Sequence, residues 1–349
     1  MRRRSTILTA AAAIAAATSL LLTGCVAGEG SAAGATAKST DGAAVTRGGT
    51  LNIDFATYNP LSLVIKKEGW LEKALKKQDI TVNWVQSAGS NKANEALRAG
   101  AIDVGSTAGS AALLARSNGS AIKTIDIFSQ PEWSALVVGA GSKITSVKEL
   151  KGKQIAATKG TDPYFFLLQA LEANGLSAND VTIQNLQHAD GWAALQNGSV
   201  DAWSGLDPIM ANAQKSGAKL IYRNVKFNTY GFLNATESFL KSKPDVAQTV
   251  VNTYEYARAW AEKHPADTAK ILSDVAGIDP AVATTVITQR TNLGVSNVPG
   301  AAQLAVLKKV GPIFVQSGDV RSQSDIDTAL KTLLDPTFAQ KADPSAIGG

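Results

Sequence analysis

The segment LRAGAIDVGS, residues 97–106, occurs again in altered form as LQNGSVDAWS, residues 195–204. The two segments share Leu, Gly, Asp and Ser at equal spacing, and Ile102 in the first corresponds to Val200 in the second. Each predicts the last turn of a helix, a glycine that ends it and a short strand. A helix and strand that recur in this way indicate two related lobes.

The elements that precede the two copies follow the same order. Residues 50–56 and 80–86 predict strands, and residues 59–77 between them have the apolar spacing of a helix. Before the second copy, two predicted strands flank a predicted helix at residues 162–175. Strands that alternate with helices form largely parallel layers. The sequence therefore predicts an α/β fold with two lobes, each a doubly wound, mostly parallel sheet.

The chain beyond residue 240 is predominantly helical in its pattern. We expect the chain to cross between the lobes near residues 132–139 and again near residues 230–236, and its helical tail to pack on the first lobe. The lobes predicted from these crossings are residues 50–134 with 235–349 for the first, and residues 135–234 for the second.

The N-terminal residues 1–24 predict a secretory signal peptide, because three arginines precede an uncharged apolar run and a small-residue ending. An uncleaved membrane helix is the rival interpretation, since the run is long enough to span a bilayer. The ending Leu22-Thr23-Gly24-Cys25 resembles the bacterial lipobox, which favours cleavage before Cys25 and lipidation of its thiol. Residues 25–49 are rich in Gly, Ala, Ser and Thr and predict a flexible tether at a membrane surface.

Charge and cysteine content exclude several classes of function. Removal of residues 1–24 lowers Lys+Arg from 34 to 31 against 29 Asp+Glu, so the formal charge falls from +5 to +2 and a nucleic-acid partner is not expected. One cysteine and two histidines, far apart in sequence, predict no metal site. Cys25 stands where no base can be oriented, so it is not a nucleophile. We expect a monomer without a cofactor.

Polar turns follow the predicted strands, where ligands bind in parallel α/β sheets. Three of these turns pair an amide or acid with proline, at Asn59, Asp162 and Asp207, and these residues suit helix caps as well as a cleft. Asp162 and Asp207 would oppose an anion unless each carboxylate turns onto its own backbone amides, and Asp207 could instead hold an ammonium or hydroxyl group. The predicted ligand-binding residues are Asn59, Ser87, Ser106, Thr107, Ser110, Trp133, Lys159, Thr161, Trp203 and Asp207.

Three ring side chains have two alternative interpretations each. His188 follows a predicted strand and either touches the cleft or is a satisfied, partly buried histidine. Trp133 and Trp203 lie at turns and suit either the site or the core.

Four segments in order resemble the substrate-binding proteins of ABC importers, in the nitrate, sulfonate and taurine class, and most closely the aliphatic sulfonate-binding members. They are residues 96–113, 146–181, 186–208 and 230–240. The resemblance implies a type II periplasmic-binding-protein-like fold and ligand contacts from Ser106, Thr107, Thr161, Trp203 and Asp207. This chain departs from the family pattern at Leu206, where an aromatic residue is frequent, and at Thr161, where serine is frequent.

The function implied by the resemblance is capture of a small organic anion by closure of the lobes, followed by delivery to an ABC permease and its ATPase. With the predicted anchor, the protein would lie on the extracytoplasmic face of the cell membrane. An enzyme of the same fold acting on a pyrimidine or thiamine precursor, a nitrate-type ligand, and a surface protein that binds a macromolecule are the alternatives.

Overall fold

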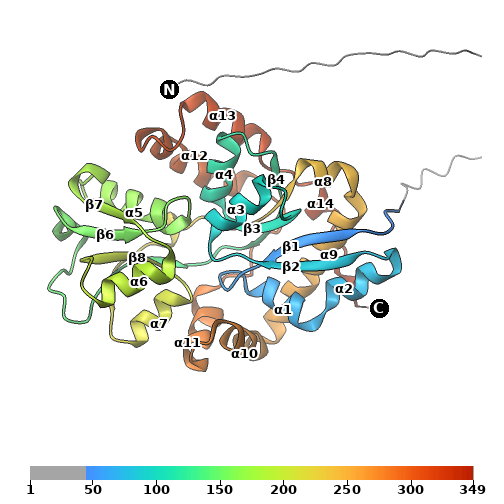
Figure 1. Ribbon diagram of the computed structural model, residues 1–349, viewed down its shortest axis with the longest axis horizontal. Helices are drawn as coiled ribbons and strands as arrows, with labels where there is room; N and C mark the ends of the chain where they lie inside the picture. Colours follow the sequence, from blue (N-terminus) through green and yellow to red (C-terminus); the bar gives the residue numbers. More distant parts are fainter. Residues whose placement is uncertain (1–44, 349) are drawn as a thin grey trace, which may run out of the picture. The chain divides into compact units, whose positions relative to one another are not determined.

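The computed structural model describes residues 45–348 (Figure 1). The predicted signal peptide, the lipidation site at Cys25 and the tether up to residue 44 lie outside the described residues. The last tether residues precede β1 (Thr50–Phe55) and are hydrogen-bonded to the following fold. Thr46 N donates to Asp245 Oδ2 at 2.7 Å, and Gly48 N donates to Gln78 O at 2.8 Å. These bonds fix the position from which β1 begins.

The first lobe is built on a five-stranded sheet in the order β2-β1-β3-β10-β4. Its strands are β1, β2 (Thr81–Gln86), β3 (Val104–Ala108), β4 (Ile122–Ser129) and β10 (Gly231–Thr236). Strand β1 is parallel to β2 and β3, whereas β10 is antiparallel to both β3 and β4. Four strands therefore share one direction, which confirms a mostly parallel sheet, and the strand that returns from the other lobe is the exception.

The second lobe repeats this plan in a sheet of order β7-β6-β8-β5-β9. Its strands are β5 (Ser134–Val138), β6 (Gln154–Ala157), β7 (Thr182–Asn185), β8 (Ala202–Leu206) and β9 (Lys219–Arg223). Strand β6 is parallel to β7 and β8, and β5 is antiparallel to β8 and β9. In each lobe the antiparallel strand is the first one after the chain crosses from the other lobe. Because β10 belongs to the first sheet, residues 231–234 lie in the first lobe and not in the second, where the sequence prediction placed them.

The repeated sequence segments occupy equivalent places in the two lobes. Helix α3 (Ser90–Arg98) leads into β3, and helix α6 (His188–Gln196) leads into β8. In the first lobe Asn52 N donates to Asp103 Oδ2 at 2.8 Å, and in the second Gln154 N donates to Asp201 Oδ2 at 2.8 Å. The shared aspartate therefore bonds the neighbouring strand near its start in both lobes.

The remaining helices cover the sheets and connect the lobes. In the first lobe these are α1 (Pro60–Glu68), α2 (Trp70–Leu75), α4 (Gly109–Ser117), α8 (Glu237–Ser242) and α9 (Pro244–Lys263); in the second they are α5 (Asp162–Ala173) and α7 (Ile209–Lys215). The apolar stretch 59–77 is interrupted at Gly69, whose φ of 66° ends α1 in the left-handed conformation that glycine adopts readily.

The C-terminal tail contacts both lobes and not the first alone. It comprises α10 (Pro265–Ala276), α11 (Pro280–Thr285), a π-helical turn at Val286–Arg290, α12 (Ala301–Gln316), α13 (Gln323–Thr332) and α14 (Thr337–Gln340). In Figure 1, α12 and α13 lie above the sheets beside α4, and α10 and α11 lie below them near α7. The rings of Phe314 in α12 and Phe165 in α5 have centroids 4.3 Å apart, within one apolar cluster that includes residues of both lobes.

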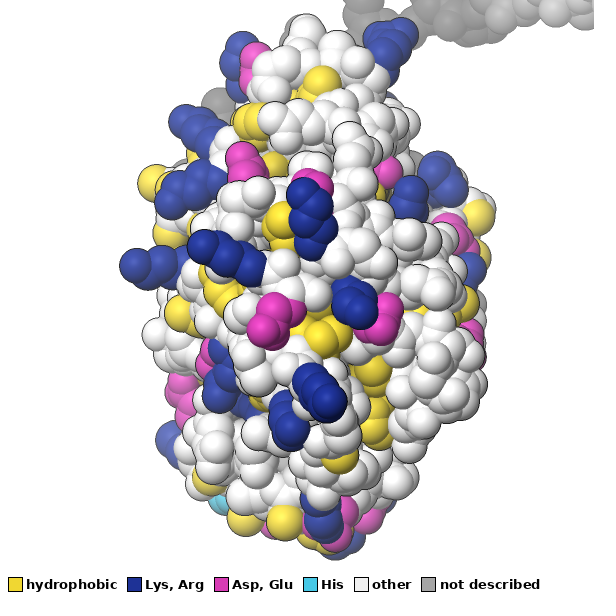
Figure 2. All heavy atoms as spheres, turned by 90° about the vertical axis from the view of Figure 1, so that its left-hand side faces the viewer, with side chains coloured by type: hydrophobic (Ala, Val, Ile, Leu, Met, Phe, Trp, Pro, Cys, Tyr) yellow, Lys and Arg dark blue, Asp and Glu magenta, His cyan; other side chains and the backbone are white. Residues whose placement is uncertain are grey.

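The outward face of the second lobe carries charges of both signs. Figure 2 shows Lys and Arg side chains spread over this face with Asp and Glu among them. Lys151 pairs with Asp180 at 3.3 Å and Lys153 with Asp201 at 3.9 Å on this lobe. Among residues 45–348, no helix is both long and apolar enough to cross a membrane.

Candidate functional site

The candidate site lies where the helices that follow the parallel strands of the two lobes meet. Helices α1, α3 and α4 follow β1, β2 and β3 in the first lobe, and α5, α6 and α7 follow β6, β7 and β8 in the second. Ser110 in the first turn of α4 donates from Oγ to Asp162 Oδ1 at the start of α5, at 2.6 Å. The walls of the cleft between the lobes are therefore in direct contact.

Asp162 is the centre of a buried hydrogen-bond cluster between the lobes. Its Oδ1 accepts from Ser110 Oγ at 2.6 Å and from Thr229 Oγ1 at 2.7 Å, and its Oδ2 accepts from Thr229 N and Trp133 Nε1, both at 2.7 Å. Burial raises the pKa of this carboxyl, and the bonds from the two hydroxyls and the indole lower it. Trp133 and Thr229 belong to the two crossing segments, so one carboxyl group holds the second lobe to α4 and to both crossings.

The sequence predicted Asp162 as a helix cap, and this prediction was wrong. The N-cap of α5 is Thr161, and Asp162 is the first helical residue. For Asn59 the same prediction is confirmed, because its Oδ1 accepts from Ser62 N at 3.4 Å and Pro60 opens α1. The sequence pattern is the same at both turns, and only the side chains brought in from elsewhere in the chain distinguish them.

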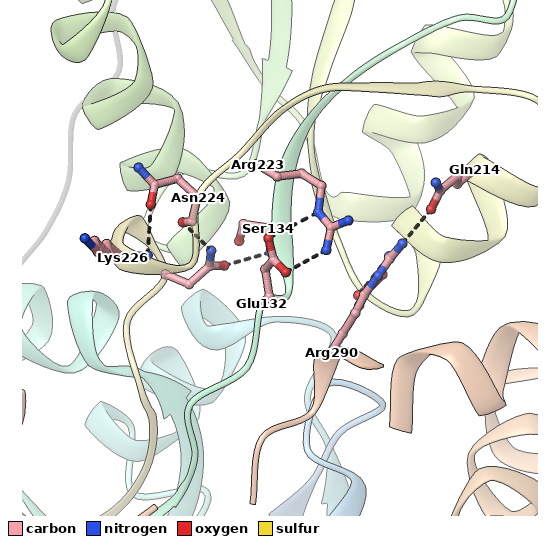
Figure 3. Close-up of polar contacts among 9 residues, drawn as sticks. Glu132, Ser134, Gln214, Arg223, Asn224, Lys226 and Arg290 are labelled. Atoms are coloured by element: carbon pink, nitrogen blue, oxygen red, sulfur yellow. Dashed lines mark hydrogen bonds and ion pairs between the residues drawn. The ribbon is translucent and has the colours of Figure 1, made fainter. Parts of the chain in front are cut away.

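Asp207 lies in a second polar cluster between the lobes, partly drawn in Figure 3. Its Oδ1 accepts from Ala211 N in the first turn of α7 at 2.9 Å, and from Arg290 Nη1 at 3.0 Å. Burial raises the pKa of Asp207 to about 6, against the opposing effect of the Arg290 charge. Arg290 also donates to Gln214 of α7, as Figure 3 shows. The N-cap residue of α7 is Pro208, so the prediction of a cap at Asp207 was wrong, and Asp207 is half of a buried ion pair that also bonds the first turn of the helix.

Arg290, like Thr229, is a site residue that the sequence did not predict. Its side chain is 5% exposed and stands at the end of the π-helical turn in the tail. Backbone bonds fix the segment, since Glu132 N donates to Arg290 O and Asp207 N donates to Trp133 O, both at 2.9 Å. A small pocket beside the pair is lined by Tyr58, Pro131, Trp133, Asp207 and Arg290, among others. Nothing local in the sequence marks this arginine.

The predicted residues of the first lobe are buried in an internal network next to the cleft. Ser106 donates to Asp54 Oδ1 from N at 2.8 Å and from Oγ at 3.0 Å, and burial raises the pKa of Asp54 to about 7 against the bonds from Ser106 and Ser87. Thr107 Oγ1 accepts from Asn234 Nδ2 at 2.7 Å. Asn59 Nδ2 donates to Tyr254 OH at 3.2 Å.

The predicted residues of the second lobe are dispersed. Thr161 is buried and donates from Oγ1 to Thr158 O at 2.6 Å. Lys159 is exposed, with Nζ 5.7 Å from the ring centre of Tyr164. Trp203 lies in the apolar core of the second lobe, 6.1 Å from the ring of Trp192. The structure thus brings together Ser110, Trp133 and Asp207 at the lobe junction, and sets Lys159 and Trp203 apart from them.

Comparison with known proteins gives relatives for most of this fold. A family model described as NMT1/THI5 like matches residues 63–268. A protein of Bacillus subtilis (strain 168), named as an aliphatic sulfonates-binding protein, is 32% identical over 236 residues, which are 66% of this chain and 70% of that one. A protein of Escherichia coli (strain K12) with the same name is 27% identical over 249 residues, 70% of this chain and 77% of that one.

Solved structures are similar over most of the chain. The alkanesulfonate-binding protein SsuA from Xanthomonas axonopodis pv. citri, bound to MOPS, is 26% identical with a TM-score of 0.74 and covers 82% of this chain and 99% of its own. The desulfurization enzyme DSZB, at 15% identity and a TM-score of 0.61 over 83% of this chain and 97% of its own, shares the fold alone. This fold therefore includes an enzyme, whereas the curated relatives are named as binding proteins. Because the family model matches more than half of the sequence, the chain belongs to the NMT1/THI5-like family.

Proposed function

We propose that the chain is the extracytoplasmic solute-binding component of an ABC importer, and that it captures an aliphatic sulfonate or a taurine-like aminosulfonate between its lobes. Its similarity to proteins named for sulfonate binding supports this assignment. The observation on which the proposal chiefly rests is the gathering of hydrogen-bond donors for oxyanions at the lobe junction, where Ser110, Trp133, Thr229 and Arg290 surround two carboxylates.

Donors of this kind suit a sulfonate as well as a carboxylate, because both are oxyanions that accept charge-assisted hydrogen bonds. Ser110 belongs to the first lobe and its partner Asp162 to the second, so separation of the lobes releases the serine hydroxyl. Arg290 is in the tail and its partners Asp207 and Gln214 are in the second lobe, so the same motion frees part of the guanidinium. An entering anion meets these donors before the lobes close again.

The ligand then favours closure because it binds the closed arrangement of the lobes more tightly than the open one. The chain crosses between the lobes at residues 130–133 and 224–230, between the strands of the two sheets. These are the segments whose backbone absorbs the rotation. Delivery requires a permease that recognises the closed form, and lipidation of Cys25 would keep the protein beside that permease.

The test is a thermal-shift and calorimetric panel with the mature chain against ethanesulfonate, butanesulfonate, taurine, sulfate and nitrate. A sulfonate at one hundred times its dissociation constant stabilises the folded protein by about 2.7 kcal/mol, a shift of about 5 °C in Tm. Failure of every sulfonate to stabilise the chain would overturn the proposal. A response to nitrate alone would replace the sulfonate with a nitrate-type ligand.

A matched pair of arginine variants locates the site. Arg290→Gln removes the buried cation at the junction and should weaken sulfonate binding. Arg223→Gln removes the ion pair with Glu132, at 2.6 Å and 45% side-chain exposure of the arginine, and should leave affinity unchanged. Equal losses in the two variants would place the anion elsewhere.

A further inference from the structure

His188 has a buried ring nitrogen, Nε2, that belongs to neither of the polar clusters around Asp162 and Asp207. The residue is 2% exposed and begins α6 in the second lobe. Its Nδ1 lies 3.2 Å from Thr158 Oγ1, and that hydroxyl donates its single hydrogen to Leu186 O at 2.7 Å. Nδ1 must therefore carry the ring proton and donate to Thr158, which leaves Nε2 as an acceptor. Within residues 45–348, Nε2 has no hydrogen-bond partner.

The neutral form of the ring is the stable one at this place. Burial lowers the pKa of His188 to about 4, so the imidazole is uncharged at pH 7 and Nε2 keeps its lone pair. An uncharged ring with a free lone pair repels an anionic head group and attracts a hydrogen-bond donor.

Across the junction, His188 faces the start of α3 in the first lobe. A Cβ placed on Gly89 would lie 3.0 Å from His188 Nε2 and 2.8 Å from Asn91 Oδ1. Asn91 Oδ1 is also buried and has no hydrogen-bond partner in the described part of the chain. Two acceptors, one from each lobe, are therefore directed at the same side of the Gly89 backbone, which approaches them closely because it has no side chain.

Two acceptors that share one spot without a donor are an unusual arrangement, because buried polar atoms in proteins are nearly always hydrogen-bonded. The junction of Asp162 shows the opposite arrangement, with several donors around one oxyanion. The cleft thus has one region rich in donors and another rich in acceptors. A ligand with an anionic head and a hydrogen-bond donor on its tail matches both.

We infer that His188 Nε2 and Asn91 Oδ1 form a subsite for an amino or hydroxyl group on the ligand tail, so that the chain prefers aminosulfonates or hydroxysulfonates to plain alkanesulfonates of equal length. This inference rests on the proposed function and specifies the class of ligand. Lobe closure brings the two acceptors together, and the donor group of the tail satisfies both.

The test compares 2-aminoethanesulfonate and 2-hydroxyethanesulfonate with propanesulfonate, by calorimetry on the mature chain. The wild type should bind at least one of the first two about tenfold more tightly than the alkane. His188→Leu should abolish this preference and leave propanesulfonate affinity unchanged, whereas His188→Gln, which keeps an acceptor, should retain part of it. Asn91→Leu should act as His188→Leu does.

The control is His264→Leu, which replaces the other histidine of the chain, 46% exposed in its side chain beyond the end of α9. This variant should leave the affinities for all three sulfonates unchanged. Preference of the wild type for the alkane, or equal loss of all three ligands in the His188 and Asn91 variants, would overturn the inference and leave sulfonate capture intact. Equal loss would mean that the two side chains support the shape of the cleft and make no contact with the ligand tail. If the wild type binds none of the three, the proposed function itself fails and the inference fails with it.

Discussion

Asp162→Ala is the substitution that most directly tests the lobe junction. The change removes the acceptor of four hydrogen bonds and leaves their donors buried. The hydroxyls of Ser110 and Thr229 can turn to other acceptors, but Trp133 Nε1 and Thr229 N cannot turn. Each unsatisfied buried donor costs about 1–3 kcal/mol, so the variant should lose about 2–6 kcal/mol of stability.

Asp162→Asn provides the sharper comparison, because the carboxamide can satisfy the same groups. Its oxygen has to replace Oδ2, since both donors there are N–H groups. Its NH₂ group then faces the hydroxyls of Ser110 and Thr229, which can accept. We expect this variant to lose about 1–2 kcal/mol, well below the alanine variant.

The pH dependence of the unfolding free energy distinguishes the effect of the Asp162 charge from that of its hydrogen-bond geometry. Burial raises the pKa of Asp162 in the folded state, so the folded protein holds this proton more tightly than the unfolded chain does. The stabilisation by the protonated carboxyl is complete below the unfolded pKa of about 3.9 and is lost as the pH rises through the folded value. The stability difference between the wild type and Asp162→Asn should therefore shrink as the pH rises above 4.

Urea unfolding followed by tryptophan fluorescence measures these differences, at pH 4 and pH 7. Asp190→Ala, an exposed acid in the first turn of α6, is the control for loss of charge at a helix start and should lose no more than about 1 kcal/mol. Equal stability of Asp162→Ala and the wild type would refute the cluster, and equal losses in the alanine and asparagine variants would refute the assignment of donors.

Three further predictions concern other parts of the chain. Arg290→Gln leaves Asp207 buried without its cation and should cost about 3–5 kcal/mol, part of which Asp207→Asn should restore in the double variant; additive losses in urea unfolding would contradict the pair. Burial raises the pKa of Asp54 to about 7, so the wild type should lose stability as the pH rises from 4 to 7, and Asp54→Asn should reduce that loss. Thermal unfolding at both pH values measures the loss, and an equal loss in the variant would contradict the raised pKa. Cys25→Ser should release the protein from membranes in cell fractionation with ligand affinity intact, whereas retention on the membrane would favour an uncleaved helix.

Local sequence was sufficient to predict the two lobes and the start of one helix, α1. The repeated segments predicted equivalent helix and strand pairs, and the structure places them as α3 with β3 and α6 with β8. Asn59 caps α1 as expected, because its bond partner is three residues away. The antiparallel direction of β5 and β10 has no local signal, since apolar alternation is the same for a strand of either direction.

The junction could not be predicted, because its contacts join distant parts of the chain. Asp162 bonds Thr229 across 67 residues, and Arg290 pairs with Asp207 across 83. The Asp-Pro pattern at residues 162–163 suits a cap, and only the arrival of Trp133 and Thr229 turns the carboxylate away from its own helix. Trp203 was open between core and site, and the packing of the second lobe determined its place.

On the proposed function, the ring contact between Phe314 and Phe165 would affect how quickly a solute can enter. Helix α12 packs on α4 as well as on α5, so the lobes cannot move apart unless the helix slips over one of these neighbours. Slippage of buried aromatic rings is a slow step compared with diffusion of a small anion. Uptake would then be limited by the frequency of opening, and a smaller side chain at position 314 would speed both capture and release. A helix remote from the ligand would thus determine the kinetics of transport.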